Sequence, residues 1–260
     1  MSSYQGKTAL VTGASSGIGE AFAKLLAAEG ANLILVARRE ERLQKLAEEL
    51  RLSNSIQVTI IAMDLSAANA PTTLYQATRE KGLTVDVLIN NAGVGKHGDF
   101  LETSLADHHQ TINLNVIALN DLTYLYGQDM AERGAGQILL VASLASFLPI
   151  PRFATYAASK AYVLALGESL AKELQSAGVS VTTLCPGGTS TEFMDLSGQQ
   201  IDGLRKLAMM SSEEVAQAGL KAMKKKQPVV VPGLLYKFSV AGLRFFPRRI
   251  QAIFGQLATD

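Results

Sequence analysis

The chain has 260 residues, of which 48% are hydrophobic, with a formal net charge of +1 and one cysteine. A charge so close to zero argues against a protein that binds nucleic acid over its whole surface. The lone cysteine excludes an intramolecular disulfide and fits a reducing compartment. The N-terminus has no apolar signal core, and no run of about 18 apolar residues occurs, so we expect a cytoplasmic location without a membrane span.

Predicted strands and helices alternate along the chain. The strands cover 7–12, 32–36, 56–61, 85–90, 136–142, 179–185 and 228–231, and the helices cover 17–29, 40–52, 67–81, about 104–130, 155–176 and 212–224. Most of the strands are continuous apolar runs, as in parallel strands covered on both faces. We therefore expect an α/β fold, a Rossmann-type doubly wound parallel sheet of about seven strands with a C-terminal helical extension. No linker or repeat divides residues 1–260, which favours a single domain.

A glycine-rich turn joins the first strand to the first helix. Its spacing is Gly-x-x-x-Gly-x-Gly, and its residues are Gly13, Ala14, Ser15, Ser16, Gly17, Ile18 and Gly19. Glycines let a backbone approach a pyrophosphate, and the helix N-terminus supplies free N–H groups. A glycine-rich hairpin can be merely structural, but the strand before it and the helix after it favour a dinucleotide site.

The end of the second strand indicates which dinucleotide is bound. A carboxylate at this position would hold a ribose 2′-hydroxyl and repel a 2′-phosphate. Ala37 stands there instead, followed by Arg38 and Arg39. Because guanidinium groups bind phosphate through paired donors, we predict NADP(H), with Arg38 on the 2′-phosphate and Ser15 or Ser16 assisting. Arg39 is assigned to the start of the charged second helix, an interpretation that also remains open for Arg38.

A phenol, an ammonium group and a hydroxyl are predicted to meet near the fifth strand. Tyr156 and Lys160 are four residues apart, which places them on one face of a helix, and Ser143 follows the strand at 136–142. This combination suits proton transfer to and from an oxygen atom. The Tyr–Lys spacing alone is usually found on solvated surfaces, so the assignment depends on the other motifs.

Together these motifs resemble the short-chain dehydrogenase/reductase family, and within it the NADP-linked bacterial reductases. The resemblance runs from Lys7 to about Val231, and the matching pieces are Thr12–Gly19, Asn90-Asn91-Ala92-Gly93, Asn115, Ser143, Tyr156-x-x-x-Lys160 and Pro186-Gly187 with Thr191. It implies an NADP(H)-dependent oxidoreductase that transfers a hydride between nicotinamide and a ketone, an aldehyde or a secondary alcohol. The alternative is a catalytically silent nucleotide-binding or membrane-associated regulatory protein, against which the intact catalytic set argues.

The resemblance also implies a role for each catalytic residue. Tyr156 is the general acid in reduction and the general base in oxidation. A free phenol has a pKa of about 10, and a cation within about 4–6 Å lowers such a pKa, so Lys160 is predicted to lower the pKa of Tyr156 and to hold the nicotinamide ribose. Ser143 binds the substrate oxygen. Asn115 holds a water that links Lys160 to solvent, and Asn113 is the competing candidate.

Further cofactor contacts follow from the same resemblance. Asp64 is expected at the adenine, with a helix cap near Ser66 as its alternative role, and Asn90 could be a turn residue. The remaining contacts are Leu65 beside the adenine, Asn91, Ala92 and Gly93 at the adenosine ribose, and Pro186, Gly187, Thr189 and Thr191 at the carboxamide end of nicotinamide.

The segment 187–210 resembles the substrate lid of the family and carries Phe193 and Met194. With Leu144 and Phe147 these residues predict an apolar pocket beside Ser143 and Tyr156, although Phe and Met are more often plain core. We therefore expect a hydrophobic small-molecule carbonyl or alcohol as substrate. The histidines lack metal-ligand spacing, so no metal is expected.

The C-terminal segment 233–260 is basic and amphipathic. Leu234, Leu235, Phe238, Ala241 and Phe245 are spaced for one helical face, and Pro247 interrupts the pattern. No acidic residue occurs between Glu214 and Asp260, whereas eight basic residues do: Lys221, Lys224, Lys225, Lys226, Lys237, Arg244, Arg248 and Arg249. Two interpretations remain open: peripheral contact with an anionic membrane, or packing on its own domain or across a dimer, which we favour slightly. A homodimer or homotetramer is expected.

Overall fold

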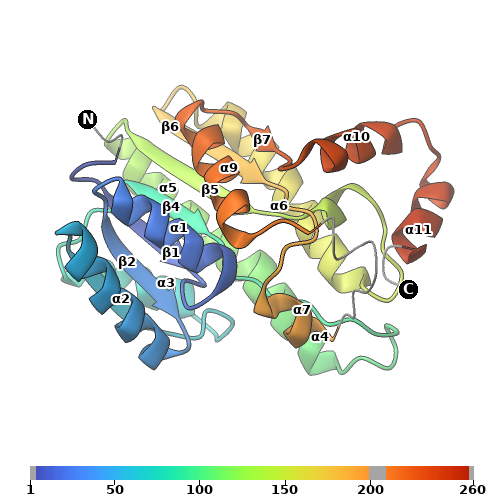
Figure 1. Ribbon diagram of the computed structural model, residues 1–260, viewed down its shortest axis with the longest axis horizontal. Helices are drawn as coiled ribbons and strands as arrows, with labels where there is room; N and C mark the ends of the chain where they lie inside the picture. Colours follow the sequence, from blue (N-terminus) through green and yellow to red (C-terminus); the bar gives the residue numbers. More distant parts are fainter. Residues whose placement is uncertain (1–3, 199–208, 258–260) are drawn as a thin grey trace.

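The computed structural model describes residues 4–198 and 209–257. A seven-stranded sheet with the order β3-β2-β1-β4-β5-β6-β7 runs through them, and every strand pairing is parallel (Figure 1). The strands are β1 (Thr8–Thr12), β2 (Asn32–Ala37), β3 (Val58–Ala62), β4 (Val87–Asn90), β5 (Gly136–Val141), β6 (Val179–Leu184) and β7 (Val229–Val230). The predicted Rossmann-type sheet is confirmed, and each strand lies within two residues of its predicted bounds.

Helices cover both faces of the sheet. One face packs against α1 (Gly17–Ala28), α2 (Glu40–Asn54) and α9 (Ser212–Lys224), and the other against α3 (Ala70–Glu80), α5 (Leu119–Glu132) and α6 (Ala154–Glu173). Strand side chains alternate between the two layers: Leu33 and Leu35 of β2 pack on the first face, whereas Ile34 and Val36 pack on the second. Burial on both faces explains why the strands are continuous apolar runs.

The largest departure from the predicted elements lies in the long helix expected at about 104–130. It divides into α4 (Leu105–Ile112), a π-helical segment (Asn113–Ala118) and α5. Short π-helical segments occur preferentially at functional sites, and this one contains Asn115, which is fully buried. The widened turn barely changes the spacing of apolar residues, so the sequence pattern did not indicate it.

Asn90 is not the turn residue that the sequence allowed. It is the last residue of β4 and is buried, and its side-chain amide donates to Thr123 Oγ1 (2.9 Å) and to the carbonyl of Leu119 (3.3 Å). Asn90 therefore ties the end of β4 to α5.

Two helices follow β7, namely α10 (Leu234–Leu243) and α11 (Arg248–Leu257), and they lie at one side of the molecule (Figure 1). The apolar residues singled out in the sequence, Leu234, Leu235, Phe238, Ala241 and Phe245, are exposed. The expectation that this stripe packs on its own domain is therefore wrong, because Tyr236 and Val240 on another face of α10 make that contact. Within residues 4–198 and 209–257, no helix is both long and apolar enough to cross a membrane.

Candidate active site

A cavity of about 840 Å³ opens at the carboxyl ends of the strands, where the strand order reverses between β1 and β4. Ligands bind at this position in doubly wound sheets because two neighbouring crossovers leave the sheet on opposite faces there. Residues that follow the carboxyl ends of β1 to β6 line the cavity. Further lining residues come from the helices α4, α6, α7 (Glu192–Ser197) and α10.

The glycine turn forms a cradle that side chains would fill. Gly13 has a φ of +68°, and a Cβ there would lie 2.8 Å from Asn91 Nδ2. A Cβ on Gly19 would lie within 2.3 Å of the Gly13 carbonyl. Ser16, the N-cap of α1, makes no side-chain capping bond, which leaves first-turn N–H groups available to an anion. The cradle therefore fits the pyrophosphate of a dinucleotide.

Thr12 and Asn91 brace the ends of β1 and β4 against each other. Thr12 Oγ1 accepts from the backbone N–H groups of Asn91 and Ala92, both at 3.0 Å, and Asn91 Nδ2 donates to the Thr12 carbonyl at 2.9 Å. Asn91, Ala92 and Gly93 line the cavity as predicted. The sequence singled out Thr12 only as part of the glycine motif, whereas in the structure its buried hydroxyl holds together the backbone at the base of the glycine turn.

The two arginines after β2 lie differently from each other. Arg38 lines the cavity and makes a long ion pair with Asp64, at 3.9 Å. Arg39 also lines it and donates to Ser15 Oγ (3.1 Å) and Ser16 Oγ (2.8 Å). Arg39 is the N-cap of α2, as the sequence indicated, but its guanidinium turns back to the glycine turn. Sequence reasoning missed this second phosphate-binding candidate.

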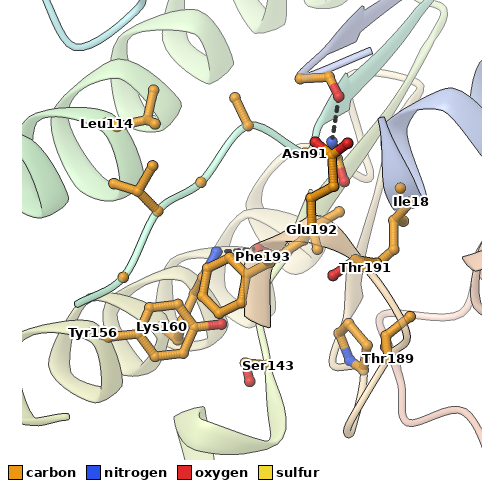
Figure 2. A pocket seen from close by; sticks show the side chains of 18 of the residues that line it. Ile18, Asn91, Leu114, Ser143, Tyr156, Lys160, Thr189, Thr191, Glu192 and Phe193 are labelled. Carbon is orange, nitrogen blue, oxygen red and sulfur yellow. Dashed lines mark hydrogen bonds between the residues drawn. The ribbon is translucent and has the colours of Figure 1, made fainter. Parts of the chain in front are cut away.

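A carboxylate from α7 occupies the same guanidinium cluster. Glu192 binds Arg39 at 2.7 Å and Arg42 at 2.6 Å. The hydrogen bonds from Arg42 and Arg39 lower the pKa of Glu192 to about 2. These ion pairs connect the segment after β6 to α2. Glu192 also lines the cavity, as Figure 2 shows.

Asp64 and Leu65 lie where the resemblance placed them, on the cavity wall after β3. Asp64 Oδ1 accepts from the backbone N–H (2.9 Å) and the hydroxyl (2.7 Å) of Ser66. It caps no helix, because α3 begins at Ala70 after the N-cap Asn69. The alternative role predicted for Asp64 is therefore wrong, and its bonds form a local turn instead.

Tyr156, Lys160 and Ser143 meet on the cavity wall, as Figure 2 shows. Tyr156 and Lys160 come from α6, and Ser143 follows β5 at the start of the 3-10 turn Leu144–Phe147. Lys160 Nζ donates to the Val141 carbonyl at 2.8 Å and lies 5.7 Å from the centre of the Tyr156 ring. Ser146 Oγ donates to the Lys160 carbonyl at 2.8 Å, which ties the 3-10 turn to α6.

The pKa values of this group differ from the expectation. Burial raises the pKa of Tyr156 to about 12, and a hydrogen bond with Ser143 only partly offsets this. Burial also lowers the pKa of Lys160 to about 8. Desolvation dominates this pKa, and the contribution that opposes it is the hydrogen bond with Ser143 rather than the charge of Lys160. The lowering of the Tyr156 pKa by Lys160 therefore stays a prediction. Tyr156 holds its proton at neutral pH, which suits a proton donor.

Asn115 rather than Asn113 points into the protein, since Asn115 is buried and Asn113 is exposed. Its Oδ1 accepts from the Val94 N–H (2.9 Å), and its Nδ2 donates to the Val94 carbonyl (2.8 Å) and to Ser159 Oγ (3.0 Å). Ser159 Oγ donates to the Tyr156 carbonyl at 2.7 Å. The π-helical segment thus connects the Val94 loop to the backbone that carries Tyr156.

Apolar residues surround the group formed by Tyr156, Lys160 and Ser143. The Tyr156 ring stacks on Phe153, with centroids 4.4 Å apart, and lies 5.3 Å from Phe193. Predicted substrate residues Leu144, Phe193 and Met194 line the cavity, whereas Phe147 packs toward the core instead. Residues that sequence reasoning missed are Leu114, Ile150, Phe153 and Tyr236.

The predicted nicotinamide residues Pro186, Gly187, Thr189 and Thr191 also line the cavity. Gly187 is close to Tyr236 of α10, and a Cβ on Gly187 would lie 2.4 Å from the Tyr236 ring. Part of the predicted lid, residues 199–208, lies outside the described residues. Cys185 is buried, and burial raises the pKa of its thiol to about 12, so it is an unreactive core residue.

Comparisons with known proteins agree with this geometry. The family model described as short chain dehydrogenase matches residues 7–202. A ketoacyl reductase of Nostoc sp. is 33% identical over 235 residues, which cover 89% of this chain and 80% of the relative. Solved structures also match over nearly their whole length. A short-chain dehydrogenase from Sphingobium yanoikuyae in complex with NADPH has a TM-score of 0.82 and 32% identity, covering 95% of this chain and 98% of the other. A family member from Burkholderia phymatum in complex with NAD has a TM-score of 0.84 and 27% identity, with 97% of each chain covered.

This chain is a member of the short-chain dehydrogenase/reductase family of oxidoreductases.

Proposed function

We propose that the protein is an NADP(H)-dependent reductase of apolar ketones or aldehydes, acting on CH–OH groups in the reverse direction. The observation that carries the proposal is the protonated phenol of Tyr156 on the wall of a cavity whose other end holds a glycine cradle and two guanidinium groups. Nicotinamide, when bound, supplies or accepts the hydride. The protein's own contribution is to position the carbonyl and to supply the proton.

In this proposal Tyr156 donates its proton to the carbonyl oxygen, and Ser143 hydrogen-bonds the same oxygen and stabilises its developing negative charge. Lys160 binds the nicotinamide ribose hydroxyls. Asn115 positions α6 through Ser159 and Tyr156, and its predicted part in a proton relay to solvent remains a prediction. The residues that would hold the cofactor are Gly13, Ser15, Ser16, Gly17, Ile18, Gly19, Arg38, Asp64, Leu65, Asn91, Ala92, Gly93, Pro186, Gly187, Thr189 and Thr191.

Preference for NADPH over NADH is expected to depend on Arg38. A charge-assisted hydrogen bond contributes about 1.5–3 kcal/mol, so Arg38→Ala should raise the Kd of NADPH about 10- to 100-fold and leave that of NADH nearly unchanged. Arg39→Ala should act in the same direction, because Arg39 orders Ser15 and Ser16. Fluorescence titration with both cofactors measures the ratio, and an unchanged NADPH/NADH ratio in both variants would contradict the assignment.

Glu192 should act in the opposite direction. Its carboxylate binds Arg39 and Arg42, so a cofactor phosphate at Arg39 must compete with it. We expect Glu192→Gln to tighten NADPH more than NADH, whereas Glu80→Gln, at the exposed end of α3, should change neither. Weaker NADPH binding in Glu192→Gln would show that Glu192 orders the site rather than competing for it.

An apolar substrate is supported by Phe153, Phe193 and Leu144 around Tyr156, and the Nostoc relative is named a ketoacyl reductase. The test is NADPH consumption with ketones and aldehydes of increasing chain length. Burial of each methylene contributes about 0.8 kcal/mol, so kcat/KM should rise about fourfold per methylene until the cavity is filled. No NADPH consumption with any carbonyl would end the proposal. A homo-oligomer and a cytoplasmic location remain predictions.

A further inference from the structure

Helices α10 and α11 and the turn between them carry a set of exposed apolar side chains. We define the tail surface as the exposed residues Leu234, Leu235, Phe238, Phe245, Phe246, Ile253, Phe254 and Leu257. The relative exposure is 64% for Leu235, 74% for Phe238 and 87% for Phe245. Clustered exposed apolar side chains of this kind mark an interaction surface, whereas single ones are ordinary.

The tail surface belongs to an ordered arrangement. Gln251 of α11 is buried, and its Nε2 donates to the carbonyls of Leu243 (3.0 Å) and Phe246 (2.9 Å), which fixes α11 to the end of α10. Gly255 packs against the loop before α6, where a Cβ would lie 2.1 Å from the Pro149 carbonyl. Both helices are therefore held to the rest of the protein, and they lie at one side of the molecule (Figure 1).

Cations flank these apolar residues. Lys237, Arg244, Arg248 and Arg249 are all exposed on α10, α11 and the turn between them. No acidic residue occurs from 215 to 259. Apolar side chains interspersed with basic ones, without acids, are typical of helices that lie in the interface of an anionic bilayer.

We propose that the tail surface docks on an anionic lipid bilayer, with Phe238 and Phe245 entering the interface and Arg248 and Arg249 binding lipid phosphates. A second copy of the chain fits less well. A two-fold interface places the same patch on both partners, so it would bring two cation clusters together without an opposing charge. The lipid surface supplies that charge.

The docking surface and the catalytic cavity share α10. Tyr236 lies on the packed side of this helix and contributes to the cavity wall beside Gly187 and Gly188. If the proposed reductase function holds, the bilayer is then the source of its apolar carbonyl substrate. The docking itself does not depend on that function, because it is measured without turnover.

The test is co-sedimentation of the full-length protein with vesicles of phosphatidylcholine alone or mixed with phosphatidylglycerol. We expect binding to the anionic vesicles only, weakening as salt screens the attraction. Each basic side chain near an anionic surface contributes about 1 kcal/mol, so Arg248→Gln/Arg249→Gln should weaken partitioning about 25-fold. Phe238→Ser/Phe245→Ser should weaken it as well.

Two matched variants control for general surface effects. Lys81→Gln/Lys172→Gln removes two exposed charges elsewhere, and Leu52→Ser/Leu101→Ser removes two exposed leucines (88% and 93% exposed). Both should bind vesicles like wild type. No binding to anionic vesicles at low salt would overturn the proposal, as would equal loss in the control variants. Self-association that Phe238→Ser/Phe245→Ser abolishes, without vesicle binding, would identify a copy–copy interface instead.

Discussion

Replacing Tyr156 with phenylalanine is expected to reduce kcat about 100- to 10,000-fold, the contribution typical of general acid catalysis. The Kd of NADPH should stay within a few-fold of wild type. The ring keeps its stacking on Phe153 and its contact with Phe193, so the cavity wall is preserved while the proton donor is lost. Steady-state kinetics and a fluorescence titration of NADPH measure the two quantities.

Tyr162 provides the control on the same helix. Its hydroxyl donates to Asn120 Oδ1 at 2.8 Å, and it does not line the cavity. Tyr162→Phe should therefore leave kcat unchanged. Activity of Tyr156→Phe within a few-fold of wild type would remove Tyr156 from the catalytic role.

Lys160→Met is expected to lose both turnover and NADPH affinity. The reason is that the Lys160 ammonium group has two proposed roles: it binds the nicotinamide ribose, and it supplies the positive charge next to Tyr156. In the wild type, kcat/KM should fall as pH rises through about 8, where the buried ammonium loses its proton. This alkaline limb should be absent from the residual activity of the variant. A wild-type profile that is flat through pH 8 would contradict the role of the Lys160 charge.

The same substitution should not destabilise the fold. The pKa of Lys160 is about 8 in the folded protein and about 10.5 when the side chain is free, so burial of its charge opposes folding below pH 8 and the penalty fades as pH rises to 10.5. Lys160→Met removes that penalty and keeps the apolar stem. Its melting temperature at pH 7 should equal or exceed that of wild type, which separates loss of function from loss of structure.

Local patterns in the sequence were sufficient to predict the fold and the outline of the site. These patterns each span only a few residues, so backbone sterics and periodicity determine their geometry. They are the continuous apolar strands, the turn from Gly13 to Gly19, and the spacing of Tyr156 and Lys160. Parallel pairing then places every strand's carboxyl end at one edge of the sheet. For this reason Ser143, Asn91 and Thr191 line the same cavity although they are far apart in the chain.

Features that depend on long-range packing were not predictable in this way. Arg39 is held by Ser15, Ser16 and Glu192, which is 153 residues away, so the second strand alone could not show where its guanidinium points. The pKa of Tyr156 is set by its burial, which no spacing reveals. Tyr236 reaches the cavity because α10 packs across the 3-10 turn after β5, and the pattern of the tail carries no signal for that contact.

Direct hydride transfer is tested most directly with NADPH carrying deuterium at C4 of nicotinamide, prepared as each of the two epimers. The alcohols formed from the carbonyl panel are examined by mass spectrometry. Deuterium should appear on the carbinol carbon from one epimer only, since a single binding mode would present one face of the nicotinamide ring to the carbonyl. Tyr156→Phe should suppress formation of the alcohol. Alcohol without deuterium from either epimer, or label lost to water, would contradict the proposed reductase.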